Sequence, residues 1–295
     1  PDTPDTPTSP TEIPDTPEIS CPSGSTTFTG KQTFERDIHY CGKDITSTET
    51  FTFPLNSLSI YNCNFNGCVA QSPGGAISLT TRSYTGIGNT VFQNCNFDKC
   101  KSTASGGAVY IDNSRKESDI TFTNCHFTNN VGGSKGGAIH CKILSINIED
   151  CKFVNNKAPS EPEIYQELNS GTAFSVSLQN NVFEQNNDFS TETNLINFKC
   201  LKNSQITVTN NKFFINSLSK SKISLFYFNV AQKVAVTEFT TKFSNNCVSS
   251  SEVNIYKSSK TFNESPVAND FTELCKNDTP DTPTSPTEIP DTPDT

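Results

Sequence analysis

The sequence predicts an all-β fold in which one chain coils into a single-stranded parallel β-helix of about seven rungs. The first observation is a phenylalanine that returns at steps of 26 to 32 residues. The second is the pattern around it, with Cys, Asn or Thr two positions earlier and Cys or Asn three positions later. The third is that short runs of alternating apolar residues separate these points. Period-two runs indicate strands with one buried face, and a helical period of 3.6 does not persist anywhere.

The repeated positions define a structural ladder that we expect to stack inside the coil. Its aromatic members are Phe65, Phe97, Phe127, Phe153, Phe183, Phe213 and Phe243. Its amide members are Asn130, Asn156, Asn186, Asn216 and Asn246, with Cys68 and Cys100 at the same place in the first two units. Stacked Asn amides donate and accept hydrogen bonds along the axis. We therefore interpret them as structural rather than as a calcium-binding or ice-binding row, since calcium prefers carboxylates.

Each unit is expected to hold three short strands separated by sharp corners. The first alternates, as in Ile206-Thr-Val208, and the second carries Cys or Asn and then Phe, as in Asn211-Lys-Phe213. Asn tolerates the left-handed backbone that a tight corner needs. The third strand follows Gly-Gly-Ala at 74–76, 106–108 and 136–138, where glycine lets neighbouring rungs approach closely. A leucine-rich repeat is the competing fold, but it would place a helix or an extended return at this third strand.

The predicted boundaries follow composition. Residues 1–20 and 277–295 are Pro/Thr/Asp-rich linkers that cannot bury apolar surface, so we expect them to be disordered. Residues 21–50 are interpreted as an N-terminal cap, 51–246 as the β-helix repeats and 247–276 as a C-terminal cap.

The two linkers share one sequence. The fifteen residues Thr3–Pro17 recur as Thr279–Pro293. Identical borders on both sides suggest that the chain is one unit of a longer protein with tandem copies.

The net charge of −9 belongs to the linkers. Each linker holds five acidic residues and no basic residue, so 31 − 10 = 21 acidic residues face 22 Lys and Arg in the middle of the chain. This balance argues against a nucleic-acid partner. The sequence has no run of ~20 apolar residues, so we expect no direct membrane insertion by this segment.

Twelve cysteines without metal-type clustering favour an oxidising, extracellular or cell-surface location. Neighbouring rungs lie ~4.8 Å apart, which a disulfide accepts. The pairs considered are Cys63 with Cys95, Cys68 with Cys100, Cys125 with Cys151, Cys21 with Cys41, and Cys247 with Cys275. For the three rung pairs a column of buried thiols is an equal alternative, because stacked side chains point in parallel. Disulfides are favoured for the two cap pairs.

The sequence predicts no catalytic, cofactor-binding or metal-binding residue. His126 and His140 occupy outward slots of their strands and are interpreted as ordinary exposed positions, while the neighbouring cysteines point inward. Polysaccharide lyases and hydrolases also use parallel β-helices, but they need clustered carboxylates. Glu161 and Glu163 lie instead in a proline-containing loop. We therefore expect that the chain is not an enzyme.

Two motifs in register resemble the repeats of the polymorphic outer membrane protein (Pmp) family. Gly-Gly-Ala precedes Ile or Val at residues 74, 106 and 136, and FxxN occurs five times from Phe127 to Asn246. The resemblance covers about residues 51–246. It implies a right-handed parallel β-helix on a cell surface, with adhesion as the usual role, and it supplies no catalytic residue.

We therefore expect a non-catalytic, secreted or surface-displayed module that acts as an adhesin or a structural stalk. A binding surface would lie in the variable insertions Thr80–Gly88, Ser114–Ser118 and Ala158–Ser170, because loops protrude from a rigid rod. The expected partner is a host-cell surface protein or glycan, and no cofactor is expected. An inert spacer and a polysaccharide-active lyase or hydrolase remain as alternatives.

Overall fold

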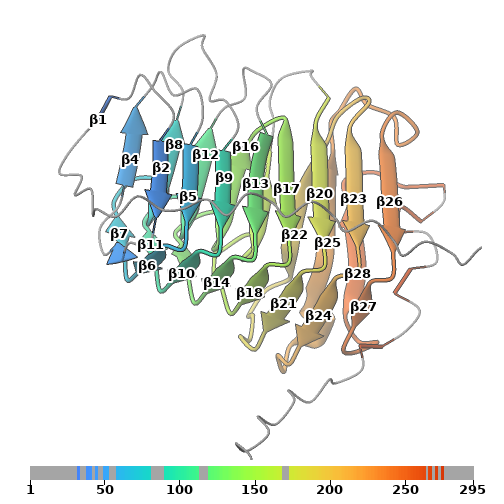
Figure 1. Cartoon of the computed structure of the whole chain (residues 1–295). Coiled ribbons are helices and arrows are strands. Elements are labelled where there is room, and N and C mark those ends of the chain that lie inside the picture. Colours follow the sequence, from blue (N-terminus) through green and yellow to red (C-terminus); the bar gives the residue numbers. More distant parts are fainter. Residues whose placement is uncertain are drawn as a thin grey trace, which may run out of the picture.

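The computed structural model describes residues 58–80, 90–112, 119–167, 173–263, 265–267, 270–271 and 274–275, and the backbone of four strands between residues 32 and 52. Both Pro/Thr/Asp-rich linkers lie outside the described residues. Within them the structure is almost entirely β, with one short 3-10 helix, η1 (Lys220–Lys222). Every strand pair is parallel, which confirms the predicted parallel β-helix (Figure 1).

Three long sheets and one short sheet form the walls of the coil. Sheet A contains β1 (Gln32–Thr33), β4 (Glu49–Thr52), β8 (Ile77–Thr80), β12 (Val109–Asp112), β16 (Ile139–Lys142), β19 (Ile164–Gln166), β22 (Thr193–Cys200), β25 (Ile223–Val230) and β28 (Asn254–Ser258). Sheet B, which faces the viewer in Figure 1, contains β2 (Ile38–Cys41), β5 (Leu58–Tyr61), β9 (Thr90–Gln93), β13 (Asp119–Thr123), β17 (Ser145–Glu149), β20 (Ser175–Gln179), β23 (Gln205–Thr209) and β26 (Thr240–Ser244).

Sheet C runs along the lower side of the coil in Figure 1. It contains β3 (Asp44–Ile45), β6 (Asn64–Asn66), β10 (Asn96–Asp98), β14 (His126–Thr128), β18 (Lys152–Val154), β21 (Val182–Gln185), β24 (Lys212–Ile215) and β27 (Cys247–Val248). The short sheet D contains β7 (Val69–Ala70), β11 (Lys101–Ser102) and β15 (Val131–Gly132). The chain passes through B, C and A once per turn. Strands β1 to β3, inside the predicted N-terminal cap, pair within these same sheets.

The predicted aromatic ladder forms through most of the coil. The rings of Phe65, Phe97, Phe127, Phe153, Phe183 and Phe213 stack in that order, with centroids 4.7 to 4.9 Å apart and interplanar angles of at most 12°. These six side chains are buried at the centre of the core. In-register parallel pairing places the same residue of each turn directly above the last, so one side-chain shape repeats along the axis.

Phe243 does not continue this ladder, and its prediction was wrong. It lies in sheet B, where β26 pairs with β23 and Phe243 is opposite Val208. The residue that pairs with Phe213 is Val248. The connection between β25 and β26 spans residues 231–239, whereas the equivalent connection one turn earlier spans only 201–204. This connection is five residues longer, so the position equivalent to Phe213 is residue 248 rather than Phe243, the residue that matches FxxN.

The amides divide between a short column, an exterior pair and a second interior column. Asn130 and Asn156 form the first column, and the Asn130 Nδ2–H donates to Asn156 Oδ1 at 2.9 Å. Asn186 and Asn216 were predicted to continue it, but they lie on the exterior, where Asn216 Nδ2–H donates to Asn186 Oδ1 at 2.9 Å. The strands β21 and β24 extend one residue further than β18, so Gln185 and Ile215 take the inward slot.

The second interior column lies two residues before the aromatic position, and it contains Asn246. Asn181, Asn211 and Asn246 are buried there, and Asn181 and Asn211 each donate from Nδ2 to Oδ1 of the next asparagine at 2.9 Å. Asn246 is therefore a column member, but not of the column predicted for it. Asn246 is equivalent to Asn211, because the residues that follow it, Cys247 and Val248, pair with Lys212 and Phe213.

The same interior slots hold thiols in the earlier turns. None of the three predicted rung pairs forms a disulfide: Cys63, Cys95, Cys68, Cys100, Cys125 and Cys151 are buried thiols. The Cys95 thiol lies 3.3 Å from Ile60 O, and the Cys125 thiol lies 3.5 Å from Phe92 O. Stacked side chains point the same way, so the sulfur atoms cannot adopt the roughly 90° torsion of a disulfide. The pair Cys247–Cys275 is a disulfide as predicted, and the pair Cys21–Cys41 falls on residues that are not described.

Paired glycines allow the close contact between turns at the third corner. A Cβ atom on Gly107 would lie 2.0 Å from Gly137 O. A Cβ on Gly75 would meet Gly107 O at the same distance. Contacts this short require glycine, which explains the Gly-Gly-Ala motif by sterics alone.

Candidate functional site

The three corners of each turn differ sharply in how much length they tolerate. The corner from sheet B to sheet C always has two residues, as between β13 and β14 or between β23 and β24. Its first residue adopts a left-handed conformation, with φ of 49° to 56° at Asn94, Asn124 and Asn210. The corner from sheet A to sheet B varies: 81–89, 113–118, 143–144, 167–174, 201–204 and 231–239. The connection from sheet C to sheet A varies as well, from ten residues at 67–76 to five at 249–253. Of the three corners, only the one from sheet B to sheet C has a constant length. The corner from sheet A to sheet B lies at the edge of the coil where the strands of sheet A end.

The predicted binding loops divide between described and undescribed residues. Residues 81–88 of the first and 114–118 of the second are not described. The third, Ala158–Ser170, was expected to protrude, but residues 161–166 are buried and include β19 of sheet A. Only 168–170 of that segment remain outside the described residues.

Side chains on the outer surface of sheet A form an aromatic and histidine row beside this edge. Tyr110, His140 and Tyr165 occupy the same slot on β12, β16 and β19. The His140 ring lies 5.1 Å from the Tyr110 ring and 5.0 Å from the Tyr165 ring, edge-on to both. All three are less than a tenth exposed. His126 is exposed as predicted, but the prediction for His140 was wrong, because its tyrosine neighbours cover it.

A charged row follows at the ends of the same strands. Asp112, Lys142 and Glu167 belong to successive turns, and Lys142 Nζ lies 3.6 Å from Asp112 Oδ2 and 3.5 Å from Glu167 Oε1. Lys135 joins from the preceding corner, with its Nζ 3.5 Å from Glu167 Oε2 and 2.7 Å from the Tyr165 hydroxyl. Each charge in this row lies beside a charge of opposite sign, so the row connects three turns at the base of the variable connections.

Glu167 and His140 are each held in one protonation state near neutral pH. Contact with His140, together with the two lysines, lowers the pKa of Glu167 to about 2. Burial lowers the pKa of His140, although the Glu167 carboxylate opposes that shift. The Nε2–Oε1 separation is 3.4 Å, and neither ring nitrogen makes a well-directed hydrogen bond among the described residues. Glu167 is therefore ionised and His140 neutral, so Glu167 does not serve as a general acid near neutrality.

The interactions at this edge are structural: Lys135, Lys142 and Glu167, which we call the brace, link neighbouring turns. The carboxylates of the edge are neutralised by Lys135 and Lys142, and its aromatic groups pack against one another. The sequence pattern missed it because no residue type recurs regularly at this slot, which reads Ser78, Tyr110, His140, Tyr165 and Asn197 in successive turns. The signal that could have found it is the charge alternation at strand ends, Asp112 then Lys142 then Glu167, read at the repeat spacing.

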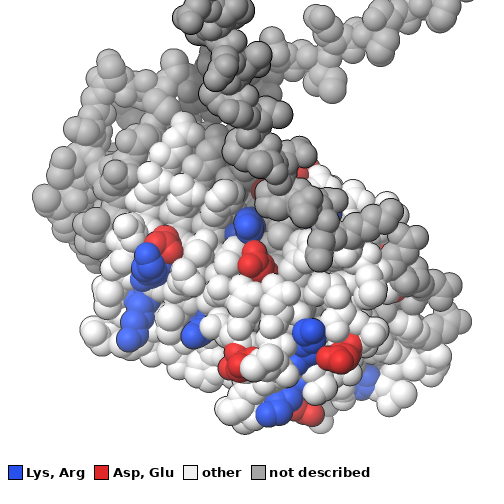
Figure 2. Space-filling model, turned by 90° about the horizontal axis from the view of Figure 1, so that it is seen from below, with Lys and Arg blue, Asp and Glu red and all other residues white. Residues whose placement is uncertain are grey.

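Charge over the rest of the visible surface shows no single-sign patch. Figure 2 shows Lys and Arg side chains interspersed with Asp and Glu over a mostly uncharged face. Among the described residues, no group of three His, Cys, Asp or Glu side chains is placed to hold a metal ion. The described part of the chain also has no helix with the length and apolar character of a membrane span.

A carboxyl group lies inside the coil. Glu163 was predicted to sit in a loop, but it is fully buried in the slot held by Ala138 in the previous turn. Asn156 Nδ2–H donates to Glu163 Oε2 at 2.7 Å, and Gln185 Nε2–H donates to Oε1 at 3.3 Å. Burial raises the pKa of Glu163 to about 8. The group ends the short amide column and has no access to a substrate.

Comparison with known proteins gives no relative. No family model, curated protein or solved structure matches the chain.

Proposed function

We propose that the chain is a non-catalytic module, secreted or displayed on a cell surface, that presents variable connections from a rigid β-helix for adhesion. The observation that carries the proposal is the contrast between corners. The two-residue corner from sheet B to sheet C and the stacked side chains are constant from turn to turn, whereas the corner from sheet A to sheet B takes lengths from two to nine residues. Surface loops on a rigid scaffold tolerate such variation and commonly carry binding residues.

The brace of Lys135, Lys142 and Glu167 supports this reading. It fixes the strand ends from which the connections 113–118 and 167–174 leave. A fixed base lowers the entropy lost when a loop binds its partner. The resemblance of Gly-Gly-Ala and FxxN to the Pmp repeats, and the disulfide Cys247–Cys275, agree with a cell-surface or secreted location. The partner class proposed is a host-cell surface protein or glycan.

The test measures binding and catalysis in parallel. The purified chain is applied to a glycan array and to cultured host cells, and it is also incubated with pectin-like and glycosaminoglycan polymers. We expect saturable binding and no soluble product. In three variants the segments 81–89, 113–118 and 168–172 are each replaced by Gly/Ser residues of equal length, and we expect at least one to lose binding while keeping its β-type circular dichroism.

The matched control changes the constant surface. Thr121 and Thr207 lie on the outer surface of sheet B, so the variants Thr121→Ala and Thr207→Ala should bind as the original chain does. Binding that survives all three replacements would refute loop presentation. No binding to any probe would identify an inert spacer, and release of soluble product would identify a polysaccharide-active enzyme; either outcome would overturn the proposal.

A further inference from the structure

Six of the core thiols stand next to one another on successive turns of the coil. The three thiol pairs are Cys63 with Cys95, Cys125 with Cys151, and Cys68 with Cys100. The strands that adjoin each pair are in register, so both members of a pair occupy the same interior slot. Two other core thiols have different neighbours. Cys141 pairs with Ile111 and Gln166, and Cys200 pairs with Val230.

The sulfur atoms repeat with nearly the same surroundings from turn to turn. The Cys95 Sγ lies 3.3 Å from Gln93 O in its own turn and 3.3 Å from Ile60 O in the preceding turn. The equivalent two distances are 3.4 and 3.5 Å at Cys125, and 3.6 and 3.4 Å at Cys100. Neighbouring sulfur atoms are therefore related by one turn of the coil, and the stacked phenylalanine rings place successive turns 4.7 to 4.9 Å apart.

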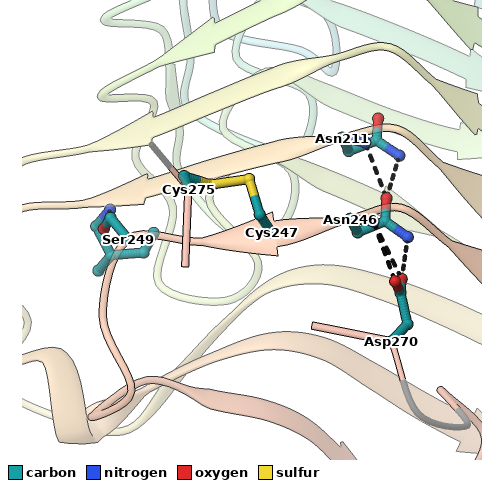
Figure 3. The surroundings of a disulfide bond; sticks show 7 residues. Asn211, Asn246, Cys247, Ser249, Asp270 and Cys275 are labelled. Carbon is teal, nitrogen blue, oxygen red and sulfur yellow. Dashed lines mark hydrogen bonds between the residues drawn. A yellow bond between two sulfur atoms is a disulfide. The ribbon is translucent and has the colours of Figure 1, made fainter. Parts of the chain in front are cut away.

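Backbone distance alone does not explain why these pairs are not disulfides. At the end of the coil, Cys247 and Cys275 form a disulfide with Cα atoms 4.9 Å apart, and Figure 3 shows their side chains turned toward each other. Neighbouring turns have a similar backbone separation, but the side chains of each thiol pair point the same way. Their sulfur atoms stay one turn apart, so an atom that joins them has to span that gap.

The gap matches two metal–sulfur bonds placed in line. A zinc–sulfur bond is about 2.3 Å long, so two bonds of this length span about 4.6 Å end to end. Zinc itself does not suit the site, because it takes four ligands and each thiol pair offers two. Copper(I) is a soft ion that prefers sulfur ligands, and it forms linear complexes with two of them.

Charge balance in the core also favours a monovalent ion. Contact with Cys125 raises the pKa of Cys95 to about 12, and burial raises the pKa of Cys125, so both thiols are protonated when no ion is bound. Binding of copper(I) forms two copper–sulfur bonds, breaks one S–H bond and releases one proton to solvent. One thiolate, one thiol and one monovalent cation then leave the pair without net charge, which avoids the cost of a buried ion.

We propose that the three thiol pairs bind copper(I), with one ion between the two sulfur atoms of each pair. All six thiols are buried in the folded coil, so the ion enters while the chain folds and is then sealed inside the core. This inference does not rest on the proposed adhesive function.

The test measures the copper content of the folded chain. The full chain is unfolded in denaturant without a reductant, so that Cys247–Cys275 persists, and is refolded without oxygen in the presence of copper(I) or of zinc(II). After dialysis against a chelator, we expect one copper ion per thiol pair and no retained zinc. X-ray absorption should show two sulfur neighbours for each copper ion and no nitrogen or oxygen neighbour. A chain that does not refold is produced instead in cells grown with added copper and is measured in the same way.

Variants of single cysteines locate the ions. Cys63→Ala and Cys100→Ala each remove one sulfur atom of a pair, and each should lower the copper content by one ion per chain. Cys141→Ala and Cys200→Ala are the matched controls, because these buried thiols belong to no pair. Both controls should keep the copper content of the original chain.

Three results would overturn the proposal. The first is a folded chain with β-type circular dichroism that retains no copper. The second is a copper content that Cys63→Ala and Cys100→Ala leave unchanged, or that the two controls lower equally. If a pair variant does not fold, X-ray absorption of the original chain decides instead: three or more sulfur neighbours, or any nitrogen or oxygen neighbour, is the third contrary result.

Discussion

Glu163 is the residue whose replacement tests the interior of the coil most directly. A carboxyl group at this slot is surrounded by core atoms, and its pKa is raised to about 8 by burial, against an ordinary value of 4.5. Between pH 4.5 and pH 8, Glu163 therefore keeps its proton in the folded state but has lost it in the unfolded state. By linkage, the free energy of unfolding falls as pH rises through this window, and the stabilisation present below pH 4.5 is lost above pH 8.

The magnitude follows from the size of the shift. Each pKa unit corresponds to about 1.4 kcal/mol, so a difference of roughly 3.5 units costs on the order of 4–5 kcal/mol at alkaline pH. Glu163→Gln replaces the carboxyl group with a neutral isostere that can still accept a hydrogen bond from Asn156. We expect the variant and the original chain to have similar stability near pH 4. At pH 9 the variant should be more stable by several kcal/mol.

The assay is denaturant unfolding, followed by circular dichroism at a series of pH values from 4 to 9. Glu149→Gln on β17 is the control, because that side chain lies on the outer surface. Burial also raises the pKa of Glu161, to about 7, but this slope is shared by the chain and the variant and cancels in their difference. Parallel pH profiles for Glu163→Gln and the original chain would show that Glu163 does not titrate as a buried group.

Three further predictions concern the packing of the coil. Phe127→Ala removes a ring stacked between two others and should lower the free energy of unfolding by about 3–5 kcal/mol, measured by denaturant unfolding; a loss under 1 kcal/mol would contradict the stacked ladder. Gly107→Ala places a Cβ 2.0 Å from a backbone oxygen and should prevent native folding. Gly67→Ala is the control: Gly67 has φ +63° and open space around it, so the substitution should lower the free energy of unfolding by only about 1–2 kcal/mol. Equal effects of the two substitutions on the melting temperature would refute the steric argument. The eight core cysteines are buried, and burial raises the pKa of Cys141 to about 12, so a thiol reagent should label none of them in the native chain and all of them after unfolding; rapid native labelling of Cys95 would show that the interior is open.

Repetition made the architecture predictable. One residue pattern recurring about every 30 residues implies one shape stacked on itself, and the spacing placed Phe97, Phe127 and Phe153 correctly. The pattern failed where turn length changed. Phe243 and Asn246 satisfied FxxN at the expected distance, but the insertion at 231–239 moved the real frame onward, so Val248 holds the aromatic slot.

The edge at the ends of sheet A was harder to predict for a different reason. The slot of Tyr110, His140 and Tyr165 holds Ser78 in the turn before and Asn197 in the turn after, so the sequence shows no regular repeat there. What links the three residues is the contact between their rings across neighbouring turns. Glu163 was hidden in the same way, because a proline-containing segment suggested a loop while the backbone pairing placed it in the core. Sequence periodicity identifies the positions that are equivalent in successive turns. Where a segment departs from the repeat, as at Glu163, its burial depends on how its backbone pairs with the neighbouring turn, which the sequence does not show.

The amide columns of this coil have a direction, and that direction bears on how such a coil can grow. Each asparagine of the two interior columns donates from Nδ2 both to a carbonyl of the preceding turn and to the next column member toward the C-terminus. Each column stops at an acid, Glu163 for one and Asp270 for the other. A gene duplication that inserts a further turn with Asn at the column slot preserves the donor–acceptor matches of that column. A deletion that removes the terminating acid leaves two N–H groups stranded in the core. Lengthening by copying internal turns is thus nearly neutral for this chain, whereas shortening from its C-terminal side is not.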